Sequence, residues 1–148
     1  MRITAKSRYA IAALIEIARQ TQSAKLVSVL SVSESLGISK IFLEQAIAQL
    51  KKVEILSSVK GARGGYLLAR DPNSITLLDI LSAVENTLFD RNETTVGDSD
   101  VGIETALNEK IWNPLDRAVS DCLSGITLSE LIDFADKQDV ARSYMLNI

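Results

Sequence analysis

Three helical patterns followed by a glycine-rich hairpin constrain the fold of this 148-residue chain more than any other feature. Over residues 7–20, the apolar positions 11, 14, 15 and 18 follow the spacing of an amphipathic helix. Residues 28–36 predict a second helix, which Gly37 ends. Ser39 is a suitable N-cap for a third helix, whose buried stripe comprises Leu43, Ala46, Ile47 and Leu50.

Two short β-prone runs follow, over residues 55–60 and 66–69, and the glycine-rich segment 61–65 separates them. This spacing predicts an antiparallel hairpin. Three helices and a hairpin in this order are the outline of a winged helix-turn-helix, in which the third helix enters the major groove of DNA. We therefore predict a mainly α fold with a small β-hairpin wing.

The second half of the chain predicts a further helix, a loop and a helical arm. Thr76 and Asp79 form a capping box in front of an apolar stripe at positions 77, 80, 81 and 84. Residues 90–102 lack any periodicity, and we expect a flexible acidic loop over residues 87–102. Residues 103–123 are helical in pattern, but Pro114 lacks an amide donor. We expect a kink or break there, with Asn113 as the N-cap of a restarted helix.

Gly125 is expected to end that helix, and a capping box of Thr127 and Glu130 predicts a short final helix to about residue 135. Together these elements predict three parts. Residues 1–86 form a winged helix-turn-helix domain, residues 87–102 form the flexible acidic loop, and residues 103–148 form a helical arm with a C-terminal tail.

The net charge of −3 hides a strong asymmetry between the two halves of the sequence. Residues 1–70 carry eleven Lys and Arg against four Asp and Glu, a net of +7, whereas residues 71–148 carry five against fifteen, a net of −10. A basic half attracts a polyanion or an acidic surface, and the acidic half would be repelled by the same partner.

The composition also excludes several kinds of site. The chain has no histidine, so His-based catalytic triads and His-ligated zinc are impossible, and we expect no enzyme activity. Cys122 is the single cysteine, which suits a reducing cytoplasm. The apolar run at residues 9–15 is too short to span a membrane. The acidic loop lacks the spacing of a calcium-binding loop, so no metal site is expected.

The polar face of the third predicted helix carries groups that suit DNA. Hydroxyl, amide and carboxylate groups can read base edges, and ammonium groups can bind phosphates. This set comprises Ser39, Lys40, Glu44, Gln45, Gln49, Lys51 and Lys52. The hairpin tip adds Lys60 and Arg63. An ordinary solvated helix face and a flexible surface hairpin are the alternatives for these two segments.

Three cations gather where the first helix begins: Arg2, Lys6 and Arg8. Free backbone amides and the helix dipole favour a phosphate at such a place. A plain charged N-terminus would explain these residues equally well.

Four segments strongly resemble the Rrf2 family of bacterial transcription regulators: MRITAKSRYA at 1–10, GISKIFLEQ at 37–45, SSVKGARGGYLL at 57–68 and ITLSEL at 126–131. The resemblance implies a homodimer, joined by a long C-terminal dimerisation helix, that binds a partly palindromic operator in double-stranded DNA, most often as a repressor. It makes Ser39, Glu44 and Gln45 base-reading candidates, Lys60 and Arg63 wing contacts, and Arg2, Lys6 and Arg8 backbone contacts.

The sequence departs from family members that hold an iron–sulfur cluster, because residues 89–105 contain no cysteine. No cluster or other cofactor is therefore expected. The sequence is more similar to the CymR-like branch, which represses cysteine metabolism and works with cysteine synthase as a partner. The carboxylate of Ile148 is the predicted group for that partner. The alternative is a protein-interaction module that binds such a partner without binding DNA.

The helical arm is expected to form the dimer interface through Ile111, Trp112, Leu115, Ala118, Val119 and Cys122, with Leu123 also buried against the partner. In this setting Cys122 is expected to be a buried structural thiol. A signal molecule must bind one state better than another to change DNA affinity. We therefore expect an effector site at the dimer helices or at residues 86–90.

Overall fold

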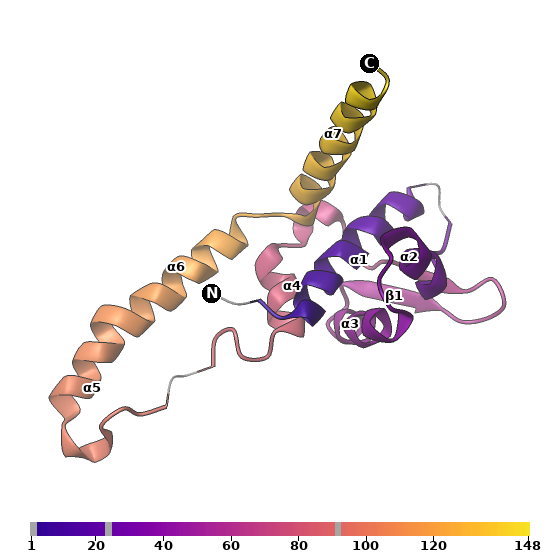
Figure 1. Ribbon diagram of the computed structural model, residues 1–148. Coiled ribbons are helices and arrows are strands. Elements are labelled where there is room, and N and C mark those ends of the chain that lie inside the picture. Colours follow the sequence, from indigo (N-terminus) through magenta and orange to yellow (C-terminus); the bar gives the residue numbers. More distant parts are fainter. Residues whose placement is uncertain (1–2, 23–24, 91–92) are drawn as a thin grey trace.

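The first three helices and the hairpin form as the sequence predicts. The structure is a computed structural model that describes residues 3–22, 25–90 and 93–148. Its N-terminal part contains α1 (Ala5–Thr21), α2 (Val29–Leu36), α3 (Lys40–Lys52), β1 (Leu56–Val59) and β2 (Gly65–Leu68) (Figure 1). This mainly helical chain with one two-stranded antiparallel hairpin confirms the predicted winged helix-turn-helix fold.

Local caps explain where these helices begin and end. The Thr4 and Ser28 side chains accept hydrogen bonds from backbone amides in the first turns of α1 and α2. Gly37 ends α2 with a φ of 66°, a left-handed conformation that glycine adopts without strain. Ser39 precedes α3 as predicted, but its side chain makes no capping hydrogen bond.

The hairpin is fastened to the chain segment before α2. Leu56 pairs with Leu68 and Val59 with Gly65 across the two strands. Val27 forms two backbone hydrogen bonds with Tyr66, at 3.0 and 2.8 Å. A Cβ atom at Gly65 would lie 2.8 Å from the Val27 carbonyl oxygen, so only glycine permits this close approach. The wing therefore has a fixed base.

The second half of the chain is almost entirely helical. It comprises the 3-10 turn η1 (Pro72–Ser74), α4 (Leu77–Val84), the 3-10 turn η2 (Gly97–Ser99), α5 (Val101–Leu107), the π-helical turn η3 (Asn108–Trp112), α6 (Asn113–Ser124) and α7 (Leu128–Leu146). Both predicted capping boxes are confirmed, at Thr76 with Asp79 and at Thr127 with Glu130. No helix in the described ranges is both long enough and apolar enough to cross a membrane.

Asn113 is not the predicted N-cap, but a regular α-helix, α6, does begin at that residue, with Pro114 in its first turn. Asn113 has helical dihedral angles, φ −62° and ψ −44°, and helical backbone runs from Val101 to Ser124 without a break. The π turn η3 lies directly before the proline. A proline ring crowds a carbonyl group in the preceding turn, and proline has no amide hydrogen to donate to that carbonyl. A wider, π-helical turn accommodates both effects. This helical run also starts two residues earlier than predicted, because Asp100 caps it.

The final helix is much longer than predicted. α7 extends to Leu146 instead of about residue 135. Its 19 residues contain neither glycine nor proline, so nothing in them stops a helix. The Arg19 guanidinium of α1 also holds the middle of α7, with Nε 2.7 Å from Asp136 and Nη2 2.9 Å from Asp139.

The core gathers around α1, which packs against α2, α3, α4, α7 and β2. The predicted stripe of α3 is fully buried, whereas Ile11 and Ile15 of the first predicted stripe are only half-buried. Leu128 and Ile132 of α7 belong to the same buried cluster as the side chains of α1, α3 and α4. The core thus includes residues from outside the predicted 1–86 segment, while the three-part division of the chain stays a prediction.

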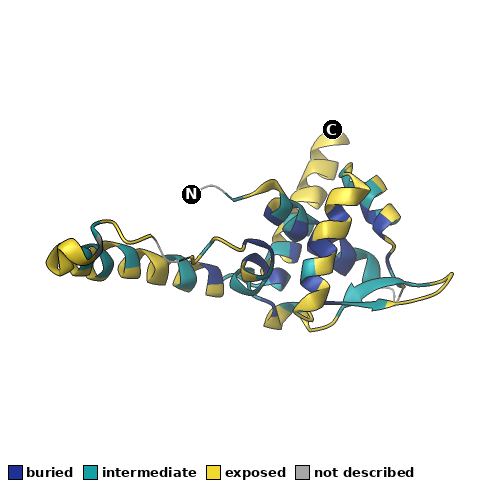
Figure 2. Ribbon diagram, turned by 90° about the horizontal axis from the view of Figure 1, so that it is seen from below, coloured by how far each residue is buried: buried dark blue, intermediate teal, exposed yellow. Residues whose placement is uncertain are grey.

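A short backbone bridge places the beginnings of α4 and α7 side by side. Thr76 pairs with Thr127, and the flanking hydrogen bonds, from the Leu77 amide to the Ile126 carbonyl and from the Leu128 amide to the Ile75 carbonyl, are both 2.8 Å long. Between these two points the chain leaves the core, forms α5 and α6, and returns. Figure 2 shows this arm as an extended, largely exposed projection.

Glu85 joins the end of α4 to the start of α1. Its buried carboxylate accepts hydrogen bonds from the Thr4 amide at 3.1 Å, the Thr4 hydroxyl at 2.8 Å and the Ser7 hydroxyl at 2.7 Å. The hydrogen bonds from Ser7 and Thr4 hold the pKa of Glu85 below its usual value, against the opposing effect of burial. The ionised carboxylate therefore stabilises the fold.

Replacing Glu85 with Gln should lower the free energy of unfolding at pH 7 by about 2 kcal/mol, because hydrogen bonds to a charged acceptor are lost. A pKa that is lower in the folded than in the unfolded chain stabilises the fold fully above the unfolded value, near 4.5, and the contribution disappears as the pH falls through the folded value. The difference between wild type and variant should therefore shrink below about pH 4.5.

Urea unfolding followed by circular dichroism at pH 7 and at pH 3 measures this difference. Glu34→Gln, which removes an exposed carboxylate of α2, is the matched control and should change little. Equal stability of Glu85→Gln and wild type at pH 7 would show that the buried carboxylate contributes nothing.

Candidate nucleic-acid interface

One side of α3 is buried and the opposite side is open to solvent. Leu43, Ala46, Ile47 and Leu50 turn inward as predicted, at 0–1% exposure. The polar residues predicted to read DNA therefore lie on the outer side. Ser39, Lys40, Glu44, Gln45, Lys51 and Lys52 are exposed, and Gln49 is half-buried.

An ion pair organises the first turns of this face. Lys40 Nζ lies 3.5 Å from Glu44 Oε1, four residues along the helix, and both side chains are at least half exposed. Such surface pairs contribute little to stability. The pair can therefore open at low cost, freeing the ammonium for a phosphate and the carboxylate for a base amino group.

Sequence reasoning missed two apolar side chains on the exposed face of α3. Ile41 is 66% exposed and Phe42 is 51% exposed. The Phe42 ring lies against Tyr9 of α1, with ring centroids 5.9 Å apart and an angle of 35° between the planes. The signal was present, because positions 41 and 42 fall outside the stripe at 43, 46, 47 and 50.

The wing presents two cations on a tight turn. Lys60 and Arg63 are exposed at the tip. Gly61 has a φ of 120°, and the Gly64 amide donates to the Gly61 carbonyl at 3.0 Å. A Cβ atom at Gly64 would come within 2.2 Å of the Val59 carbonyl oxygen. The tip therefore needs glycine at these places, and it carries its charges outward from a well-defined base.

Phosphate binding by Lys6 and Arg8 stays a prediction, and the structure shows a carboxylate at the same helix end. The Thr4 amide and the Thr4 and Ser7 hydroxyls already bind the carboxylate of Glu85, so an anion from the chain itself occupies this helix end. Lys6 is half-buried and Arg8 is exposed beside it. Arg2 lies outside the described residues.

The orientation of α2 against α1 depends on Glu16. This buried carboxylate of α1 accepts hydrogen bonds from the Ser35 hydroxyl of α2 at 2.8 Å and from the Gln20 amide at 2.7 Å. Glu16 therefore faces the protein interior, away from any bound polyanion. Most of the described basic residues of the N-terminal part are exposed instead.

The arm carries an apolar surface in a single chain. Ile111, Leu115, Ala118 and Cys122 are exposed, and Trp112 and Val119 are half-buried. These six residues stay predicted interface residues, as does burial of the Cys122 thiol by a partner. Leu123 does not belong with them, because its own chain already buries it.

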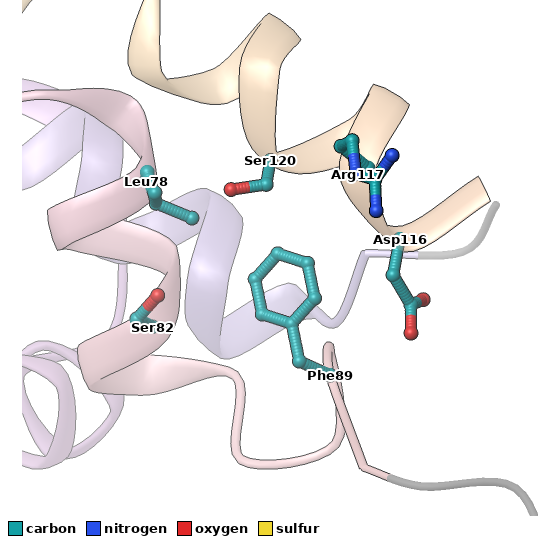
Figure 3. A pocket seen from close by; sticks show the side chains of 6 residues that line it. All are labelled: Leu78, Ser82, Phe89, Asp116, Arg117 and Ser120. Carbon is teal, nitrogen blue, oxygen red and sulfur yellow. The ribbon is translucent and has the colours of Figure 1, made fainter. Parts of the chain in front are cut away.

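A shallow surface pocket of about 480 Å³, wide open to solvent, lies where α4 meets α6. Its lining comprises Leu78 and Ser82 of α4, Phe89 of the following segment, and Asp116, Arg117 and Ser120 of α6. Figure 3 shows the Phe89 ring between the two helices, with the Ser120 hydroxyl near Leu78. The pocket thus includes Phe89, from residues 86–90, and three residues of the arm, which are the two places where an effector site is expected.

Known proteins with similar sequences and structures are transcription regulators. A family model described as Rrf2, iron-dependent transcriptional regulator, matches residues 3–134. The HTH-type transcriptional regulator IscR of Xenorhabdus nematophila is 35% identical over 145 residues, which cover 94% of this chain and 87% of that protein.

Two solved structures share the fold over most of the chain. CymR (YrzC), the global cysteine regulator of B. subtilis, has a TM-score of 0.73 and 26% identity, over 90% of this chain and 98% of CymR. T. potens IscR has a TM-score of 0.72 and 29% identity, over 99% of this chain and 96% of that one.

The description of the family as iron-dependent raises the question of a metal ligand set. The sequence supplies one cysteine, Cys122, and no histidine. Among the residues that the structure describes, no three His, Cys, Asp or Glu side chains are grouped so that they could hold a metal ion. The residues of one chain therefore do not fit a cysteine-ligated iron–sulfur cluster, and the expectation that none is bound stays a prediction.

The winged helix-turn-helix order, the exposed polar face of α3 and the match over residues 3–134 agree with one another. The sequence motifs had predicted the same family. The chain belongs to the Rrf2 family of DNA-binding transcription regulators, and it is not an enzyme.

Proposed function

We propose that this regulator binds a partly palindromic operator as a homodimer, in the cytoplasm, and represses transcription by excluding the polymerase from the promoter. The observation that carries the proposal is the exposed polar face of α3 together with the exposed cations Lys60 and Arg63 of the wing, whose strand β1 packs against α3. The +7 charge of residues 1–70 supports it, because most of the affinity of such proteins for DNA comes from phosphate contacts.

The proposed base contacts come from the first turns of α3. Gln45 can form two hydrogen bonds with adenine, Glu44 can accept one from the amino group of cytosine, and the Ser39 hydroxyl can bond to either base edge. Phosphates would be bound from both flanks of the helix and from α1. The residues in that second role are Lys40, Gln49 and Lys52 on α3, with Lys6, Arg8 and Arg2 near α1.

The wing would follow the sugar-phosphate backbone next to the groove that α3 enters. Lys60 and Arg63 are exposed on a turn whose shape depends on glycine, so the backbone of the turn can approach the DNA closely. A guanidinium is also suited to a narrow minor groove.

The proposed dimer forms through the exposed apolar side of the arm. Burying Ile111, Leu115, Ala118 and their neighbours Trp112, Val119 and Cys122 would stabilise association by roughly 25 cal/mol for each Å² of apolar surface. Two recognition helices about one DNA turn apart would then read two half-sites.

The pocket between α4 and α6 is the proposed effector site. A small molecule bound there would contact the DNA-binding core through Leu78 and Ser82 and the arm through Ser120. Because it would touch both parts, its affinity would depend on how the arm is placed relative to α3. That dependence is what linkage between an effector and DNA requires.

For the regulated genes we propose those of cysteine and sulfur metabolism, with cysteine synthase as a partner bound through Ile148. The similarity to the CymR structure and the single cysteine of the chain support this branch of the family. Val140, Tyr144, Met145 and Ile148 in the C-terminal part are exposed and therefore accessible to a partner. The sequence relatives named IscR equally support a branch of the family other than the CymR-like one.

Capture of sheared genomic DNA by the purified protein, across a salt series and followed by sequencing, tests the proposal. A shared, roughly palindromic site upstream of genes would establish the operator, and its neighbours would identify the pathway. Retention without a common site would favour the protein-interaction alternative. Repeating the capture with cysteine synthase present would show whether that partner is needed.

Replacing Gln45 with Ala should reduce affinity for the operator about tenfold or more while leaving affinity for random duplex nearly unchanged. The reason is that a bidentate contact with a base contributes roughly 1–3 kcal/mol of discrimination. Fluorescence anisotropy titrations with both duplexes measure the change. Equal losses on the two duplexes would refute the base-reading role of Gln45.

Replacing Lys60 with Ala should weaken binding to every sequence and reduce the slope of log affinity against log salt by about 0.9, which is one phosphate contact. The same titrations at four or five salt concentrations measure the slope. Lys137→Ala, an exposed lysine on α7, is the matched control and should leave the slope unchanged. An unaltered slope for Lys60→Ala would remove the wing from the interface.

A further inference from the structure

An aliphatic side chain stands among the polar groups of the recognition surface. Ile41 is the second residue of α3 and is 66% exposed, between the exposed Lys40 and the half-exposed Phe42. Among the described residues, Ile41 is not one of the hydrophobic side chains that pack on the core. Its exposure therefore has no explanation within the single chain.

The helix geometry puts Ile41 in line with a proposed base-reading residue. Ile41, Gln45 and Ala48 are spaced i, i+4 and i+7, so they share one stripe along α3, and all three are exposed. One helical turn separates Ile41 from Gln45, a rise of about 6 Å. Successive bases of one DNA strand are about 3.4 Å apart, so the two side chains can reach positions within about two base pairs of each other.

Phe42 has a different environment from Ile41. Its ring rests against Tyr9 of α1 at 5.9 Å and so belongs partly to the contact between α1 and α3. Ile41 has no such ring partner in the described chain, and it lies in the N-terminal part of the helix, which contacts base edges in helix-turn-helix proteins. Ile41 is therefore an apolar group available to a base.

The surroundings of Ile41 favour a nucleic acid over a protein as the occupant. Lys40 lies beside it, paired with Glu44, and further cations are exposed at the other end of α3, Lys51 and Lys52, and on the wing, Lys60 and Arg63. A polyanion matches this set of cations, whereas a hydrophobic protein partner would leave them desolvated and unpaired. In the major groove of DNA, the group that an aliphatic side chain can contact is the C5 methyl of thymine.

We propose that Ile41 is a specificity-determining residue that recognises the methyl group of one thymine in each half-site, within about two base pairs of the base that Gln45 reads. This inference rests on the proposed function, because it needs α3 in the major groove. It adds a preference for thymine that hydrogen-bonding groups alone would not provide.

The test uses operator duplexes in which one symmetry-related pair of thymines at a time is replaced by deoxyuridine, which lacks only the methyl group. Anisotropy titrations with the full-length protein should find one pair at which affinity falls about fourfold per half-site. That factor corresponds to the free energy of burying one methyl or methylene group, about 0.8 kcal/mol. The other pairs should have smaller effects.

Variants assign the effect to the side chain. Ile41→Ser should bind the thymine duplex more weakly and should no longer distinguish thymine from uracil at that pair, whereas Ile41→Val should keep most of the distinction. Phe134→Ser is the matched control, because Phe134 on α7 is also 66% exposed. It should bind both duplexes as wild type does. Circular dichroism melting checks that each variant is folded.

Two failures are distinguishable. Genomic capture without any shared site would refute operator reading itself. A shared operator that wild type binds equally well with uracil at every pair would refute only the role of Ile41, as would an Ile41→Ser variant that still distinguishes thymine from uracil. Either of the last two results would exclude a contact between Ile41 and a thymine methyl group.

Discussion

Two backbone hydrogen bonds join the segment before α4 to the segment before α7, at the two ends of the arm. They link Leu77 to Ile126 and Leu128 to Ile75, across the pair formed by Thr76 and Thr127. Each of these threonines also caps the helix that follows it, so one small region fixes the starting points of α4 and α7. Buried backbone groups need partners, and here each segment supplies them to the other.

The recognition surface depends on this region through α1. With α7 held at its start, Leu128 and Ile132 complete the core that α1 shares with α3 and α4. Glu85 then joins the end of α4 to the first turn of α1 through Thr4 and Ser7. The position of α3 is therefore set by contacts from both halves of the sequence, including the acidic half, which carries none of the proposed DNA contacts.

Local signals predicted much of the fold, because caps and apolar stripes act over three or four residues. The stripe of α3 and both capping boxes were predicted correctly for this reason. The hydrogen bonds of Glu85 to Thr4 span 81 positions, and no local pattern predicts them. The π turn before Pro114 was missed because the proline was interpreted as a break in the helix. The full length of α7 was missed because the weak apolar stripe after residue 135 was interpreted as the end of the helix.

The charged residues of the candidate site could also be predicted, because the buried stripe of α3 determines which residues face outward. Their arrangement could not. The pairing of Lys40 with Glu44 is one of several that the spacing allows, and the occupied end of α1 depends on the distant Glu85. The exposed Ile41 was overlooked because only polar residues were considered for DNA contacts, and apolar residues were assigned to the core.

The return of the chain to its starting region gives the arm the character of an insertion. Its first residues follow α4 and its last residues precede α7, and the core holds both of these helices. Whole helical turns could be gained or lost between residues 90 and 124 while the core keeps its contacts, since insertions are tolerated where both ends are anchored. Each added turn would lengthen the arm by about 5.4 Å. In the proposed dimer, such a change would alter the distance between the two DNA-binding cores, and so the operator spacing, without altering the residues proposed to read the bases.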